Sequence, residues 1–381
     1  MQQSYKQIEL EEYGKKPFKI KNKIRLIELF GGIGSQAMAL RDIGADFEHW
    51  KLAEWEVNAT ASYKAIHHSE NDFDYSSFLC ADELPELLYD LGISTDGKKP
   101  LTLEQIKRLG ETKQREIYNN FQATRNIGSV VNRKGKDLEI VDVDKYTYIL
   151  TYSFPCQDLS VAGKQKGMKK GSGTRSGLLW EVERLLNEVE NLPQVLLMEN
   201  VPQVASAANI EDFNAWRDFL VSKGYTNFTQ MLNAKDYGVA QNRNRCFMVS
   251  ILGDFNYEFP QPKPLEKTMN EYLEDEVDEK YYIKSEKTAQ MIEELIESGM
   301  IDRQTDRQST YRLTDQERLN GQIALRQQKE EYQTTRQKVT VLLKEQGTKL
   351  HKVTDIACTL CARDYKGFGN QEGNGVIEKW R

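Results

Sequence analysis

The chain opens with alternating apolar and amphipathic segments that predict a βαβα start. KIRLIELF holds a nearly continuous apolar run from Ile24 to Phe30, as expected of a strand buried on both faces. A glycine turn follows, and helical spacing then predicts a helix ending near Gly44. HWKLAEW and VNATASYKAIHH predict a second strand and a second helix. This order is typical of a parallel sheet with helices on its faces.

The alternation resumes after a charged segment, residues 80–120, whose helical period and turn signals predict a helical insertion. Further strands are predicted at TYILTYSF, QVLLMEN, NFTQMLNA and RCFMVSIL, and further helices at SGLLWEVERLLNEVE and EDFNAWRDFLVSKG. We therefore expect an α/β fold with a doubly wound, mainly parallel sheet. Clustered prolines in FPQPKPLEK mark a boundary, which predicts one domain over 1–253 and a smaller one over 254–381.

Composition narrows the class of protein. The 381 residues are 39% hydrophobic and 29% charged, which is ordinary for a globular protein. No apolar run approaches the about 18 residues of a membrane helix, the start has no secretory signal, and five scattered cysteines form no disulfide framework. These features predict a cytoplasmic protein. The net charge of -6 argues against coating nucleic acid by bulk charge, but local basic segments can still bind it.

The glycine turn is the first candidate site. Gly31, Gly32 and Gly34 let the backbone approach a nucleotide-like ligand, and the helix beginning there offers N–H groups. A tight turn without a ligand is an equal alternative. About twenty positions on, Glu54 can bind ribose hydroxyls and Trp55 can stack on a purine. This pair could also be a surface charge beside a core aromatic residue.

The second candidate site is SFPCQDLS, at the carboxyl end of a predicted central strand, where ligands of open α/β sheets collect. A lone cysteine is more often a small buried hydrophobic residue. Here Cys156 follows Pro155, has the polar neighbours Gln157 and Ser160, and precedes several lysines, which favour an exposed thiolate. We therefore identify Cys156 as a candidate nucleophile.

A basic, glycine-rich loop follows this cysteine. From Pro155 to Gly177 there are five basic residues and one acid, Asp158, a net charge of +4. Such a loop predicts a mobile lid over a phosphate backbone, although a solvated loop is the simpler alternative. The basic residues are Lys164, Lys166, Lys169, Lys170 and Arg175.

Two more segments carry candidate chemistry. LLMENVPQV presents Glu199 after an apolar strand, where a partly desolvated carboxylate can act as an acid, while Asn200 could be a simple cap. QNRNRCFMV places Arg243 and Arg245 at spacing two on a strand, which predicts one shared face. Two such arginines can hold a phosphate or a base oxygen, or form structural salt bridges.

In their order, FGGIG, EW, PCQ, ENV and QNRNR resemble the motif series of the cytosine-C5 DNA methyltransferases, over about Ile24 to Leu252. The resemblance implies a Rossmann-like fold that binds S-adenosylmethionine, a smaller C-terminal target-recognition domain, and double-stranded DNA as substrate. It implies that Cys156 attacks C6 of a flipped cytosine, Glu199 engages N3, and Arg243 and Arg245 hold the base. The implied cofactor positions are Phe30, Gly32, Gly34, Glu54, Trp55 and Pro155, and the implied DNA-binding positions are Gln157, Ser160, Lys164 and Arg175.

The chain departs from the family pattern at three places. Ser35 replaces a glycine, and in RNIGSVV an expected adenine-contacting aspartate is replaced at Gly128-Ser129. We also expect the two final motifs to be absent, because YRLTDQERLNG and the Gly-Asn-Gly at 373–375 match them only by chance. A second polypeptide would then supply them, or the chain is truncated. No metal site is predicted, since the Cys358–Cys361 pair has only His351 near it.

The leading hypothesis is a DNA cytosine-C5 methyltransferase, whole or as the large part of a split enzyme. The alternatives are a catalytically incomplete remnant that binds DNA or cofactor, and an RNA cytosine methyltransferase of similar fold. The length of 254–381 favours DNA, because it suits a recognition domain. Neither the recognised DNA sequence nor an accompanying restriction enzyme follows from the residues.

Overall fold

The computed structural model describes residues 16–159 and 167–272, with isolated positions at 274, 278, 294, 297 and 357–358. Its contacts divide the chain into two units, 1–232 with 244–261, and 233–243 with 262–381. In the second unit, β6 (Gln241–Asn242) pairs with β8 (Ala357–Cys358). The first unit holds the sheet and most of the candidate site.

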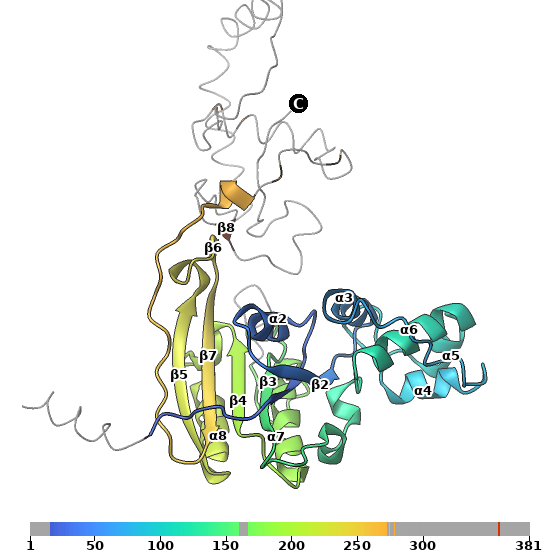
Figure 1. Cartoon of the computed structure of the whole chain (residues 1–381), viewed down its shortest axis with the longest axis horizontal. Helices are drawn as coiled ribbons and strands as arrows, with labels where there is room; N and C mark the ends of the chain where they lie inside the picture. Colours follow the sequence, from blue (N-terminus) through green and yellow to red (C-terminus); the bar gives the residue numbers. More distant parts are fainter. Residues whose placement is uncertain are drawn as a thin grey trace, which may run out of the picture. The chain divides into compact units, whose positions relative to one another are not determined.

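A six-stranded sheet forms the centre of the first unit, in the order β2-β1-β3-β4-β7-β5 (Figure 1). β1 is parallel to β2 and β3, β3 is parallel to β4, and β7 runs antiparallel to β4. The mainly parallel sheet is thus confirmed. Its strands are β1 (Ile24–Leu29), β2 (Phe47–Ala53), β3 (Thr147–Tyr152), β4 (Val195–Asn200), β5 (Tyr225–Asn233) and β7 (Asn244–Leu252).

The register brings the carboxyl ends of four strands to one edge of the sheet, the carboxyl edge. Leu29 lies opposite both Ala53 and Tyr152, and Tyr152 lies opposite Met198. Because β7 runs the other way, Cys246 near its beginning pairs with the last residue of β4. The segments that follow β1 to β4, and the one that precedes β7, therefore meet at this edge.

Helices cover both faces of the sheet. Ile27 and Leu29 of β1 belong to a buried cluster with α7 and α8, whereas Ile24 and Leu26 belong to another with α2. This alternation follows from the two-residue period of a strand, and the doubly wound prediction is confirmed. The larger helices of the unit are α2 (Ser35–Asp42), α3 (Val57–His67), α7 (Leu179–Glu188) and α8 (Ile210–Ser222).

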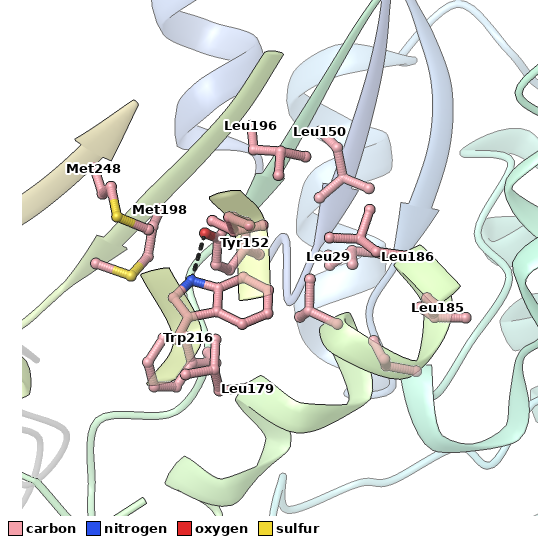
Figure 2. Packing of buried hydrophobic residues seen from close by; sticks show 14 of the residues in the cluster. Leu29, Leu150, Tyr152, Leu179, Leu185, Leu186, Leu196, Met198, Trp216 and Met248 are labelled. Atoms are coloured by element: carbon pink, nitrogen blue, oxygen red, sulfur yellow. Dashed lines mark hydrogen bonds between the residues drawn. The ribbon is translucent and has the colours of Figure 1, made fainter. Parts of the chain in front are cut away.

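The core beneath the carboxyl edge is built around one aromatic pair. Trp216 of α8 is fully buried, and its indole Nε1–H donates a hydrogen bond of 3.1 Å to the Tyr152 hydroxyl (Figure 2). A buried indole needs such a partner, since an unpaired N–H costs free energy. Tyr152 ends β3, four residues before Cys156, so the candidate nucleophile follows a firmly packed strand.

The predicted helical segment contains α4 (Leu84–Asp90), α5 (Leu103–Lys107) and α6 (Glu111–Ala123). These helices have a core of their own, with Leu88, Ile106, Ile117 and Phe121 buried together. Figure 1 shows them beside the end of the sheet that carries β2. In the part of the chain that the structure describes, no helix is long and apolar enough to span a bilayer.

Candidate active site

The glycine turn after β1 lies against the polar groups of α3. Gly34 has φ +82°, and a β-carbon there would lie 2.4 Å from His67 Nε2, so only glycine fits. Phe30 also has a positive φ, 57°, and its N–H donates to the Ala53 carbonyl at 2.8 Å. At Gly32 a β-carbon would meet nothing within 4 Å, which leaves open space above the turn.

Carboxylates accept the backbone N–H groups that the sequence analysis expected to be available to a ligand. The Glu54 side chain accepts from the N–H of Gly32 at 2.9 Å and from that of Glu56 at 2.8 Å. Glu28, fully buried in β1, accepts from the N–H of Ala37 in the first turn of α2 at 3.3 Å. The expectation of a helix N–H free for a ligand was therefore wrong at Ala37, because the buried acid Glu28 accepts this group.

Burial raises the pKa of both acids. For Glu28 the pKa rises to about 7, although hydrogen bonds from Tyr63 and Ala37 oppose the rise. For Glu54 desolvation also raises the pKa, while the N–H groups of Glu56 and Gly32 lower it. The Tyr63 hydroxyl donates to Glu28 at 2.5 Å and lies 2.7 Å from His49 Nδ1, which extends this network under the turn.

These residues suit a nucleoside cofactor without phosphates. Glu54 and Glu28 already accept the N–H groups of Gly32 and Ala37, which the pyrophosphate of a dinucleotide would need as donors. S-adenosylmethionine carries no phosphate, its sulfonium is positive, and the space above Gly32 gives it room. Phe30, Gly32, Gly34 and Glu54 are brought together by the structure, and Trp55 follows directly, its carbonyl accepting from Ser94 N–H at 2.8 Å.

Asn126 is a site residue that the sequence analysis missed. Its side chain is almost fully buried and makes two hydrogen bonds with the Glu54 backbone. It accepts from the N–H at 3.2 Å and donates to the carbonyl at 2.9 Å. It also accepts from Gly128 N–H at 2.8 Å and donates to the Thr60 hydroxyl at 3.0 Å. Nothing in the pattern of RNIGSVV singles out this amide, because its partners lie up to 72 residues away in sequence.

The replaced aspartate position also has a structural explanation. Gly128 has φ +82°, and a β-carbon there would lie 2.1 Å from the Leu91 carbonyl oxygen. The N–H of Ser129 donates to the same carbonyl at 2.8 Å. This segment therefore packs against the end of α4, and it leaves no room for the side chain of an acid at residue 128.

In the loop after β3, the two residues just before Cys156 accept hydrogen bonds from side chains of other segments. The amide of Asn200, at the end of β4, donates to the Phe154 carbonyl at 2.9 Å. The Ser176 hydroxyl donates to the Pro155 carbonyl at 2.7 Å. Cys156 itself is half-buried and packs against the main core cluster. Asn200, interpreted in the sequence as a possible cap, thus ties the Glu199 strand to the Cys156 loop.

Glu199 and Arg245 form an ion pair at the same edge. Arg245 Nε lies 2.9 Å from Glu199 Oε1, and the two side chains are 15% and 20% exposed. A pair this well shielded is weakened less by salt than one on the surface. The structure thus brings these two predicted residues together.

The two arginines do not lie on one unbroken strand, as the sequence analysis expected. β6 ends at Asn242 and β7 begins at Asn244, so the strand is interrupted at Arg243. Arg243 falls in the second unit, where its carbonyl accepts from Ala234 N–H at 3.0 Å and its own N–H donates to Asn233 Oδ1 at 3.0 Å. The spacing of two holds only for an unbroken strand.

The described half of the basic loop is anchored, in contrast to the lid predicted for the whole of it. Met168 is fully buried, and Lys170 forms an ion pair of 2.6 Å with Glu183. The Asp158 carboxylate accepts from the N–H of Arg175 at 2.8 Å. These contacts fix the segment to α7 and to the loop after β3.

Arg175 is engaged within the protein. Its guanidinium donates to the Gln157 side chain and, at 2.9 Å, to the Gly97 carbonyl of the helical insertion. Gln157 itself is exposed. Several sequence predictions lie outside the described residues: Ser160, Lys164, Cys361, the motif-like segment 311–321 and the Gly-Asn-Gly at 373–375.

Comparison with known proteins identifies the family. The family model described as C-5 cytosine-specific DNA methylase matches residues 107–368. The chain is 41% identical over 263 residues to the orphan methyltransferase M.SssI of Spiroplasma monobiae, an alignment that spans 66% of each protein. It is 37% identical over 265 residues to the type II methyltransferase M2.ScrFI of Lactococcus lactis subsp. cremoris, covering 69% of this chain and 71% of that one.

Among solved structures, the Entamoeba histolytica methyltransferase EhMeth matches with 17% identity and a TM-score of 0.45, over 74% of this chain and 68% of that one. The fold assignment therefore rests on the strand order of this chain itself. The sequence matches span about two thirds of the curated relatives' length. By its family model and its relatives, the chain belongs to the C-5 cytosine-specific DNA methylase family, whose members take their methyl group from S-adenosylmethionine.

Proposed function

We propose that this protein transfers a methyl group from S-adenosylmethionine to C5 of a cytosine flipped out of a specific duplex DNA sequence. The observation that carries the proposal is the meeting of three features at the carboxyl edge. These are the glycine turn after β1, the loop of Cys156, which accepts a hydrogen bond from Ser176, and the Glu199–Arg245 ion pair. The family membership of the chain supports the same substrate class.

The residues suit the demands of the reaction. Cytosine C5 is a poor nucleophile until the Cys156 thiolate adds to C6, which pushes an electron pair towards C5. Glu199 would engage N3, where charge develops during this attack, and Arg245 would hold the carboxylate in place. Bound S-adenosylmethionine supplies an electrophilic methyl group. After C5 has taken it, a solvent molecule acting as base would remove the C5 proton. The C–H electron pair would then re-form the C5=C6 double bond, and the S–C6 pair would leave on Cys156 as its thiolate.

Duplex DNA must open for this chemistry, because C5 and C6 are inaccessible within a stacked helix. We assign Gln157, Ser160, Lys164 and Arg175 to contacts with the opened DNA, Arg243 to the extruded base, and 254–381 to target recognition. Arg175 would exchange its present partners for DNA. The reaction needs a reduced thiol, which the cytoplasm maintains.

The test is transfer of a labelled methyl group from S-adenosylmethionine to mixed-sequence DNA by the purified chain, with RNA as a parallel substrate. We expect label in DNA, and a loss of at least about a thousandfold in Cys156→Ser. Cys80→Ser, which changes an exposed thiol in the insertion, is the matched control and should retain activity.

Other outcomes separate the alternatives. Transfer that requires a second polypeptide would identify a split enzyme. Label in RNA alone would favour an RNA methyltransferase, and no transfer under any condition would favour a remnant that only binds. Full activity in Cys156→Ser would contradict the covalent mechanism.

A further inference from the structure

The turn at residues 94–100, STDGKKP, belongs to the helical insertion and lies beside the segment that follows β2, which contains Glu54 and Trp55. Ser94 N–H donates to the Trp55 carbonyl at 2.8 Å, and the Ser94 carbonyl accepts from Val57 N–H at 2.9 Å. Within the turn, the Ser94 hydroxyl donates to the Lys99 carbonyl at 2.7 Å and Asp96 accepts from Lys98 N–H at 2.9 Å. The conformation is therefore fixed by local hydrogen bonds on a rigid support.

The same turn lies beside the nucleophile loop. The Arg175 guanidinium donates to the Gly97 carbonyl at 2.9 Å and to the side chain of Gln157, the residue after Cys156. The insertion thus contacts the carboxyl edge at two places: at Trp55 beside the glycine turn, and at Arg175 beside the loop of Cys156. We therefore expect a duplex that delivers a base to Cys156 to pass close to this turn.

The charges of the turn suit a polyanion. Lys98 and Lys99 are both exposed, and neither forms an ion pair with a residue that the structure describes. They begin a basic segment: residues 91–115 hold six Lys or Arg and three acids, whereas 69–90 hold seven acids and no Lys or Arg. The insertion therefore turns from acidic to basic at the point where it meets the nucleophile loop.

We propose that Lys98 and Lys99 bind the phosphate backbone of the DNA substrate beside the extruded cytosine, so that the helical insertion forms part of the DNA interface. This inference rests on the proposed function. Phosphate contacts of this kind position a duplex without reading its sequence. Each one neutralised releases a counterion, so that binding depends on salt with a slope of about 0.9 for each phosphate.

The test compares the double variant Lys98→Gln/Lys99→Gln with the wild-type protein in steady-state methyl transfer to DNA at several salt concentrations. We expect the KM for DNA to rise about tenfold at low salt, and the slope of log KM against log salt to fall by about 1 to 2. The kcat at saturating DNA and the Kd for S-adenosylmethionine should stay within about twofold, because the backbone groups of both lysines hold the turn in place and are kept in the variant.

The matched control is Lys19→Gln/Lys21→Gln, two exposed lysines just before β1 and so at the opposite edge of the sheet, which should behave as wild type. An unchanged KM and salt slope in the Lys98/Lys99 variant would overturn the inference while leaving the proposed function intact. A weaker Kd for S-adenosylmethionine with unchanged DNA binding would also overturn it. Absence of DNA methylation by the wild-type protein would instead refute the proposed function.

Discussion

The two halves of the carboxyl edge are held in different ways. On the cofactor side, side chains bind backbone groups: Glu54 accepts N–H groups of the glycine turn, and Asn126 grips the backbone of Glu54 in turn. On the nucleophile side, the central contact joins two charged side chains, Glu199 and Arg245, each partly exposed. Buried side chains bind backbone groups in both halves, since Asn200 and Ser176 donate to the carbonyls just before Cys156, but the chemical half adds an ion pair. Substitutions should accordingly affect affinity in one half and turnover in the other.

The sharpest test of this difference is Glu199→Gln. The variant keeps the shape of the side chain but loses the charge that pairs with Arg245 and the titratable group that would take up a proton and pass it to N3. We expect kcat to fall about a hundredfold to a thousandfold, as for loss of a general acid, with the Kd for S-adenosylmethionine unchanged. Stopped-flow methyl transfer and calorimetry would measure the two quantities.

The control is Glu183→Gln, which breaks another ion pair, with Lys170, on the neighbouring helix α7. It should leave kcat within about twofold. If Glu199→Gln weakened cofactor binding as strongly as turnover, the division of the edge into two halves would be wrong.

Asn126→Ala probes the cofactor half. The change leaves the backbone groups of Glu54, the N–H of Gly128 and the Thr60 hydroxyl without this partner. We expect the Kd for S-adenosylmethionine to rise about tenfold and the free energy of unfolding to fall by about 2 kcal/mol, since buried unpaired groups are costly. Turnover at saturating cofactor should change by no more than a few-fold.

Asn119→Ala provides the comparison. Asn119 also makes several side-chain hydrogen bonds, to Asp74 and Ser76 just before the insertion, and all three are far from the glycine turn in sequence. Denaturant unfolding should show a loss of stability there too, but cofactor binding should stay as in the wild type. Equal effects of both variants on the Kd would mean that Asn126 acts through general stability alone.

The smallest expected effect concerns pH. Burial raises the pKa of Glu28 to about 7, so the folded protein holds a proton that the unfolded chain has lost above its ordinary pKa of 4.5. This contribution to stability is complete below pH 4.5 and is lost as the pH rises through about 7. The pKa of His49, lowered by burial to about 3, acts in the opposite direction, but only below its ordinary value of 6.5.

Of these two groups, only Glu28 therefore changes the free energy of unfolding between pH 6.5 and 8. We expect the free energy of unfolding to fall by about 1 kcal/mol over this interval in the wild type and much less in Glu28→Gln. Urea unfolding at both pH values measures it, with Glu183→Gln as a control on a partly buried acid that is paired with Lys170. An identical pH dependence in Glu28→Gln would contradict a buried, protonated carboxyl under the turn.

The fold and the ends of its strands could be predicted from the sequence because they depend on local periodicity. The nearly continuous apolar run of β1, and the positions of Cys156 shortly after one strand and of Glu199 near the end of another, placed both residues at one edge. The contacts of Asn126, Asn200 and Arg175 could not be predicted, because their partners are backbone groups 46 to 78 residues away. The periodicity of a sequence does not identify the hydrogen-bond partners of a side-chain amide or guanidinium.

The division of the chain has a practical consequence for exchanging recognition regions between relatives. The chain leaves the first unit after residue 232, returns at 244, and leaves again after 261. A chimera with a single junction near residue 253 would combine the 233–243 segment of one parent, with Arg243, and the C-terminal segment of the other. Strands β6 and β8 would then come from different parents. Recognition regions of this architecture should therefore be transplanted as two segments together.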